Sequence, residues 1–171
     1  MSPIQQRNPH ENEEPGETSA SGEPLETPGF GLESANVDNL LTEIDHIAIA
    51  VRDLGAAIDY YRETFGAVVD HREIVESDGV EEALLKVAES YIQLLTPITE
   101  TSPVAKAIEK RGEGIHHVGY RVADCGEALA SMVAAGATPI DQAPRPGSRG
   151  TTVAFIHPKG SFGTLIELVE E

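Results

Sequence analysis

IDHIAIAV at residues 44–51 and IHHVGYRV at residues 115–122 are the two stretches that decide the fold. Each is short, rich in β-branched residues and bounded by polar residues, which is typical of a strand. Each is followed two positions later by an aspartate, Asp53 or Asp124, that can cap a helix. The recurrence of the pattern indicates that the chain contains two copies of one structural unit.

The two copies continue to match beyond the first strand. A helix is predicted in each, ending at Gly66 and at Gly136. YIQLL at residues 91–95 then corresponds to LIELV at residues 165–169, and the offsets between copies are 71, 70 and 74 residues at the first strand, the helix end and the last strand. Room remains for two more strands per copy, at about 67–75 and 80–87 and at about 138–141 and 151–157. Each copy is therefore predicted to be β-α-β-β-β.

These copies define the predicted domain organisation. An acidic tail at residues 1–40 precedes a domain at residues 41–171, whose modules span about 43–97 and 114–171. A linker helix at 103–111 joins them, with Ser102 as its cap and Gly112 as its end. The tail is predicted to be disordered, because it has too few apolar residues to offset its ordering entropy.

Composition narrows the classes of function. The net charge of -17 argues against nucleic acid as a partner. The sequence has no apolar run long enough for a membrane span and no apolar signal segment. The single cysteine, Cys125, cannot form an intramolecular disulfide, which favours a reducing, cytoplasmic location.

Four polar residues are predicted to point to the same side of the sheet. Side chains alternate between the faces of a strand, so each first strand offers a histidine, and each last strand offers an amide or a carboxylate, opposite its helix-covered face. These residues are His46, Gln93, His117 and Glu167. If the modules pair with pseudo-two-fold symmetry, the four side chains converge. Two imidazoles and two oxygens suit one divalent ion, namely Co, Mn, Ni, Zn or Fe(II).

Neighbouring residues complete this prediction. The small residues Ala48, Ala50 and Gly119 are expected to leave open volume for a ligand above the metal. His116 is expected to face away and to have a supporting role. The remaining histidines lack a counterpart in the other copy and are expected not to be ligands: His10, His71 and His157.

Several motifs, taken in order, resemble the vicinal oxygen chelate superfamily and, within it, the bacterial methylmalonyl-CoA epimerase family. They are DHIAIAV at 45–51, GVEEA at 79–83, QLLTP at 93–97, SPVAK at 102–106, GIHHV at 114–118, HPK at 157–159 and GTLIEL at 163–168. The resemblance implies an α+β fold in which two tandem βαβββ modules form a cupped, eight-stranded mixed sheet with helices on the outside. It also implies the metal ligands His46, Gln93, His117 and Glu167, and an acid/base glutamate at Glu82.

The activity that the resemblance implies is inversion of C2 of methylmalonyl-CoA through an enolate stabilised by a divalent cation. Removing a proton on one face and returning it on the other requires two groups, for which Glu82 and Glu167 are predicted. The acyl-CoA would also meet basic residues: Arg121 on the metal strand, and Arg145, Arg149 and Lys159 in loops near strand ends.

Other interpretations stay open. A glyoxalase I-type lyase would use four similar ligands, and a metal-free ligand-binding protein could share the fold. An extradiol dioxygenase uses two histidines and one carboxylate, so Gln93 argues against it. A homodimer is compatible with the exposed strand edges that such a sheet would have.

Overall fold

The computed structural model describes residues 40–171. The predicted disordered tail therefore lies, but for its last residue, outside the described residues. The described elements follow the order β-α-β-β-β-α-β-α-β-β-β, with two single-turn helices in the second half. They are β1 (Glu43–Ala50), α1 (Leu54–Phe65), β2 (Val69–Val75), β3 (Val80–Val87), β4 (Ser90–Pro97), α2 (Pro103–Arg111), β5 (Gly114–Arg121), α3 (Cys125–Ala134), β6 (Arg145–Pro146), η1 (Ser148–Gly150), β7 (Thr152–Ile156), η2 (Pro158–Gly160) and β8 (Ile166–Glu170).

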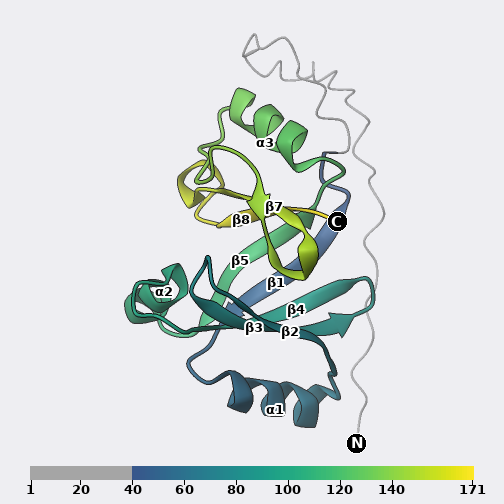
Figure 1. Cartoon of the computed structure of the whole chain (residues 1–171), viewed down its shortest axis with the longest axis vertical. Coiled ribbons are helices and arrows are strands. Elements are labelled where there is room, and N and C mark those ends of the chain that lie inside the picture. The colour runs from purple at the N-terminus through teal and green to yellow at the C-terminus, as the bar shows by residue number, and fades with distance from the viewer. Residues whose placement is uncertain (1–39) are drawn as a thin grey trace, which may run out of the picture. The chain divides into compact units, whose positions relative to one another are not determined.

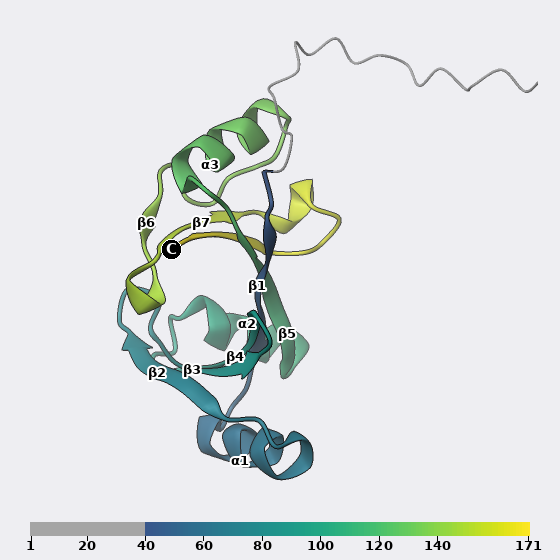
Figure 2. The ribbon, with the colours of Figure 1, turned by 90° about the vertical axis from the view of Figure 1, so that its right-hand side faces the viewer.

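The strands form one mixed, eight-stranded sheet in the order β2-β3-β4-β1-β5-β8-β7-β6. Each first strand pairs in parallel with the last strand of its own module, and the antiparallel pairing of β1 with β5 joins the modules. The sheet curls into a cup, which is clearest in Figure 2. The predicted cupped, mixed sheet of eight strands is therefore confirmed.

Two of the helices cover the outer face of the cup, at opposite ends of the described part of the chain in Figure 1. Leu54 of α1 packs with Leu94 of β4, and Leu129 of α3 packs with Leu168 of β8. Their starts follow the prediction, because the side chains of Asp53 and Asp124 accept hydrogen bonds from backbone N–H groups of the first turn.

The linker helix α2 occupies the other face of the sheet. Val104 and Ile108 of α2 form one buried apolar cluster with Ala48, Ala50 and Leu95. The prediction that helices lie on the outside is therefore wrong for α2. The volume expected to be open beside Ala48 and Ala50 is filled by this helix.

The second module departs from the prediction at its second strand. Residues 138–141 contribute only an isolated bridge from Pro139 to Ile156, and the edge strand β6 is the short segment Arg145–Pro146. The prolines at 139, 144 and 146 explain the difference, because proline has no N–H to donate to a sheet. Among the described residues, no helix is long and apolar enough to span a membrane.

Candidate metal centre and active site

The four predicted ligands lie on the four central strands of the sheet. In the strand register, Ala48 lies between Gln93 of β4 and His117 of β5. One step along, Gly119 lies between His46 of β1 and Glu167 of β8. A small residue therefore separates the long side chains of each row, which allows them to lean toward one another.

Three of these side chains meet at one point. Nε2 of His46 and Nε2 of His117 are 3.0 Å apart, and each is 2.9 Å from Oε2 of Glu167. Two ligands held about 2.1 Å from an ion at a right angle are themselves about 3 Å apart, so this spacing fits a shared cation. All three residues are buried.

Gln93 supplies the fourth candidate ligand atom. Its Nε2 donates to Oε2 of Glu82 over 2.8 Å, while its Oε1 is buried without a hydrogen-bond partner. A buried acceptor without a partner is unfavourable unless a cation or a water satisfies it. The residues present therefore fit a divalent metal ion.

The space beside Gly119, which was expected to be open for a bound molecule, is filled by the side chain of the candidate metal ligand His46. A Cβ atom placed on Gly119 would lie 2.3 Å from Cε1 of His46. The imidazole of His46 therefore rests directly on the backbone of Gly119, and the ligand cavity lies elsewhere.

Two β-bulges, at matching positions of the two copies, bring further residues to the site. The pairing of β1 with β5 skips Asp45 and, on the partner strand, His116. A bulge re-aims the side chain that it carries. Oδ2 of Asp45 lies 2.8 Å from Nδ1 of His46, and Nδ1 of His116 lies 2.8 Å from Nδ1 of His117. The prediction that His116 faces away is therefore wrong.

These contacts orient the ring of each candidate histidine ligand. A ligating imidazole usually has its second nitrogen hydrogen-bonded, which fixes the ring and its tautomer. Asp45 does this for His46, and its own carboxylate is held by Arg121 and Arg149 at 2.9 and 2.8 Å. Asp45 was not predicted as a functional residue, since strict alternation places it on the opposite face from His46.

The charges at the centre compensate one another when no metal is bound. Burial alone would raise the pKa of Glu167, but hydrogen bonds from His117 and His46 outweigh it and hold that pKa well below its usual range. Burial alone would lower the pKa of His46, but Asp45 and Glu167 raise it to about 9. In the metal-free protein, Glu167 is therefore an anion and His46 carries a proton at neutral pH.

A cation must displace that proton, so its affinity is expected to depend on pH. Metal affinity should increase by about tenfold per pH unit as the pH rises from 6.5 toward 9, and should then level off as His46 loses its proton. Competition with a chromophoric chelator at several pH values measures this dependence. Asp45→Asn removes a group that raises the pKa of His46, so the variant should level off at lower pH. An affinity that does not change with pH would contradict the protonated state of His46.

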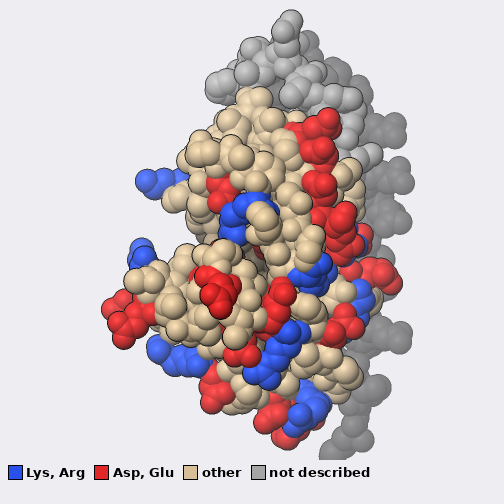
Figure 3. All heavy atoms as spheres, in the orientation of Figure 1, with Lys and Arg blue, Asp and Glu red and all other residues tan. Residues whose placement is uncertain are grey.

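A cavity of about 230 Å³ lies beside the candidate metal centre. The space-filling view shows the surface hollowed in the middle of one face, between the two halves (Figure 3). The wall combines Glu82, Gln93, His117 and Glu167 with apolar groups of α2 and β7. At about 30 Å³ per water, the volume holds roughly eight waters, which suits a small acyl group.

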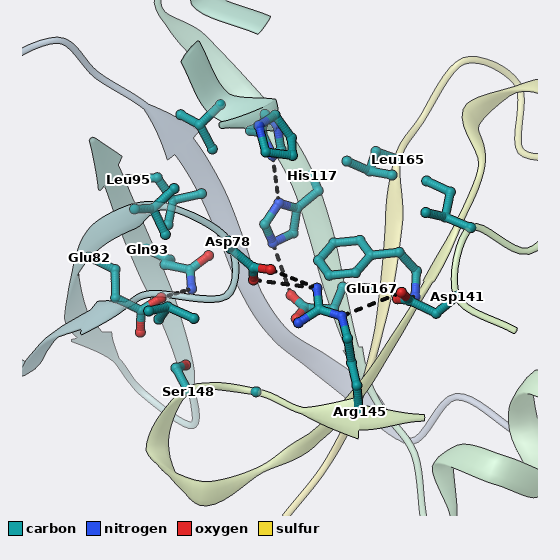
Figure 4. Close-up of a pocket in the computed structure, with 18 residues that line it drawn as sticks. Asp78, Glu82, Gln93, Leu95, His117, Asp141, Arg145, Ser148, Leu165 and Glu167 are labelled. Carbon is teal, nitrogen blue, oxygen red and sulfur yellow. Dashed lines mark hydrogen bonds and ion pairs between the residues drawn. The ribbon is translucent and has the colours of Figure 1, made fainter. Parts of the chain in front are cut away.

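Glu82 of β3 is, with Glu167, one of the two glutamates of the cavity wall (Figure 4). It is only 2% exposed, and its Oε1 has no hydrogen-bond partner. Burial raises the pKa of Glu82 to about 7, against the opposing effect of the Ser148 hydroxyl and with the support of the negative charges of Glu73 and Glu167. The group can therefore both accept and release a proton near neutral pH.

Of the four basic residues predicted to meet the substrate, Arg145 lines the cavity. Its guanidinium pairs with Asp78 at 3.1 Å and with Asp141 at 3.4 Å, as Figure 4 shows. Neither aspartate was predicted, because both lie in segments whose path the sequence pattern does not define. The remaining three, Arg121, Arg149 and Lys159, are not among the residues of the cavity wall.

Arg149 instead fastens the segment that carries Ser148 to the first module. Its guanidinium reaches Asp45 of β1, and its backbone N–H donates to Oε1 of Glu73 on β2 over 2.9 Å. Arg149 adopts a left-handed backbone conformation, with φ of 56°, which costs a non-glycine residue free energy. The contacts to Asp45 and Glu73 offset that cost and hold Ser148 at the cavity.

Residues 45–155 match the family model of the Glyoxalase/Bleomycin resistance protein/Dioxygenase superfamily, and the chain belongs to this superfamily. Several of its relatives are epimerases. The ethylmalonyl-CoA/methylmalonyl-CoA epimerase of Cereibacter sphaeroides is 38% identical over 131 residues, which cover 75% of this chain and 98% of that protein.

Solved structures of methylmalonyl-CoA epimerases are also similar to this chain. A methylmalonyl-CoA epimerase in complex with methylmalonyl-CoA and NH4+ is 43% identical, with a TM-score of 0.75, and the match covers 77% of this chain and 95% of that one. A variant of the Streptomyces coelicolor epimerase in complex with 2-nitronate-propionyl-CoA is 42% identical, also with a TM-score of 0.75, over 77% of this chain and 98% of that one.

Proposed function

We propose that the chain is a metal-dependent methylmalonyl-CoA epimerase, with its activity in the domain at residues 41–171. The observation that carries the proposal is the meeting of His46, His117 and Glu167 within 3.0 Å of one another, beside a cavity walled by Glu82. The epimerases among its relatives support the choice of reaction.

The proposed cofactor is one divalent ion, Co, Mn, Ni or Zn, held by His46, Gln93, His117 and Glu167. When bound, such an ion acts as a Lewis acid that stabilises negative charge developing on a substrate oxygen. The two imidazoles and the anionic carboxylate provide the donor set that these metals accept.

The chain's own residues would move the proton. In the proposed reaction a carboxylate oxygen of Glu82 takes the proton from C2, and the electrons of the C–H bond pass into the thioester as an enolate. Glu167 is the proposed second carrier: it would take up a proton from water and deliver it to the other face of C2, while Glu82 gives the proton that it removed back to water. The pKa of about 7 suits Glu82 to this task, whereas the low pKa of Glu167 suits it better to binding a cation.

The cavity volume supports a binding mode in which only part of the substrate lies inside the cavity. About 230 Å³ can enclose the acyl group but is too small for a whole coenzyme A, whose nucleotide would therefore lie outside. Arg145 is the proposed contact for a negative charge of the substrate, since it lies on the cavity wall. We propose a cytoplasmic location, which the lone buried Cys125 supports, and a homodimer as the form to be tested in solution.

Proton exchange at C2 tests the proposed function. Protein with one equivalent of metal, in deuterated water, is expected to introduce deuterium at C2 of methylmalonyl-CoA, and a chelator should stop the exchange. Metal bound at one equivalent without exchange would reject the epimerase while leaving the metal centre in place. Turnover of the hemithioacetal of methylglyoxal would support the lyase alternative instead.

A further inference from the structure

A second group of potential metal ligands includes Glu82 of the cavity wall and two residues of the neighbouring strand β2. His71 and Glu73 stand two residues apart on the edge strand β2, so they share one face of the sheet. Glu73 lies directly opposite Glu82 of the neighbouring strand β3. One ligand atom from each of the three residues lies within 4.8 Å of the others.

This group has charge and hydrogen-bonding capacity that the chain does not satisfy. Like charges directly opposite each other on paired strands are destabilising, and Glu73 and Glu82 form such a pair. Nε2 of His71 and Oε1 of Glu82 are both buried without a hydrogen-bond partner. Glu82 is 2% exposed, so its carboxylate has little contact with bulk solvent. A cation among the three residues would satisfy all of these groups.

The spacing of the ligand atoms fits an ion better than it fits a hydrogen bond. Nε2 of His71 lies 3.4 Å from Oε2 of Glu73, whereas a charge-assisted hydrogen bond would draw them to about 2.7–2.9 Å. Two ligands each about 2.1 Å from a tetrahedral Zn²⁺ ion are separated by about 3.4 Å. The backbone N–H of Arg149 binds Oε1 of Glu73, which leaves Oε2 of that residue for the ion.

We propose that His71, Glu73 and Glu82 form a second divalent-cation site, which inhibits the protein when it is filled. The donors are one imidazole nitrogen and two carboxylate oxygens, a set that Zn²⁺ accepts, with water as a further ligand. Glu82 joins the two sites, because Oε2 binds the side chain of Gln93 and Oε1 is free for the second ion. His71, expected from the sequence not to be a ligand, is thus a ligand outside the first centre.

Inhibition follows from the position of Glu82. A carboxylate bound to an ion is a weak base, so the second ion would withdraw Glu82 from proton transfer at C2. This consequence rests on the proposed function, whereas binding of the second ion does not. Activity is therefore expected to be highest with one equivalent of metal and to fall as a second equivalent binds.

A zinc titration of the full chain tests the site. Protein loaded with one equivalent of Zn²⁺ is titrated with more, and bound zinc and the rate of C2 exchange are measured on the same samples. The wild type should take up a second equivalent while its rate falls at least tenfold. His71→Ala should bind that second equivalent at least tenfold more weakly, and its rate should keep the value that it has at one equivalent.

Glu81→Gln is the matched control for Glu73→Gln. Glu81 precedes Glu82 on β3, points to the other side of the sheet and pairs with Arg72, so its replacement removes the same charge away from the site. Glu73→Gln should lower the affinity for the second ion, whereas Glu81→Gln should leave that affinity unchanged. A wild type that stops at one equivalent, or a second equivalent that His71→Ala retains, would overturn the proposal. A second equivalent that binds without any C2 exchange would reject the epimerase and leave the second site standing.

Discussion

Glu82→Gln is expected to lower kcat for epimerisation by roughly 10²–10⁴-fold, the usual contribution of a general acid/base group. The change keeps the size of the side chain, and its amide oxygen can still accept the hydrogen bond that Gln93 now donates to Oε2. The candidate metal ligands are not altered, so the metal content should remain at one equivalent. Steady-state rates with metal analysis on the same preparation measure both quantities.

The stability of the same variant separates lost chemistry from a damaged fold. In the metal-free protein, burial raises the pKa of Glu82 from 4.5 to about 7. A raised pKa favours folding while the group is protonated, and that contribution is lost as the pH rises through about 7. Glutamine stays neutral, so between pH 5 and pH 8 its advantage over the wild type should grow by about 2 kcal/mol. Urea unfolding at both pH values measures this difference. A variant that is less stable than the wild type at pH 8 would mean that the activity was lost through unfolding.

His117→Ala is expected to remove the metal as well as the activity. The imidazole of His117 meets both His46 and Glu167, so alanine leaves one histidine facing a buried carboxylate. Metal retained after dialysis should fall from one equivalent to less than about a tenth, and kcat/KM should fall by at least ~10³-fold, since Lewis-acid stabilisation contributes several kcal/mol.

His157→Ala is the matched histidine control. His157 precedes the short helix η2, where its Nδ1 accepts a hydrogen bond from the backbone N–H of Lys159, and it does not line the cavity. This variant should keep both metal and activity. If His117→Ala kept one equivalent of metal and its rate, the assignment of the centre would be wrong, and circular dichroism of both variants checks that they fold.

Much of the fold could be predicted because the same sequence pattern of strand, capping aspartate and glycine occurs twice in the chain. The recurring strand, the aspartate cap and the terminal glycine fix where each copy begins and turns, and they do so through local interactions. The second strand of the second copy could not be located in this way. Its prolines remove backbone donors, so the position of the short β6 depends on contacts with β7. The position of α2 inside the cup likewise depends on which face the assembled sheet leaves uncovered.

The candidate ligands could be predicted because strand alternation and the repeat independently select the same four positions. The contacts of Asp45 and His116 with the candidate ligands could not be predicted in this way, because the two bulges depend on how β1 and β5 pair across the modules. The path of the segment that carries Arg149 depends on contacts with Asp45 and Glu73, which lie more than 70 residues away in the sequence. Such long-range contacts leave no local signal in the sequence.

A bound ion would also link the two modules across the pairing of β1 with β5. Each copy contributes two of the four candidate ligands, so neither half of the chain holds a complete set. Coordination of His46 and Glu167 by one ion would close a long chain loop, which restricts the unfolded chain in the manner of a disulfide. The chain has a single cysteine and therefore cannot form an intramolecular disulfide. The bound cation would instead be a reversible cross-link between the two modules.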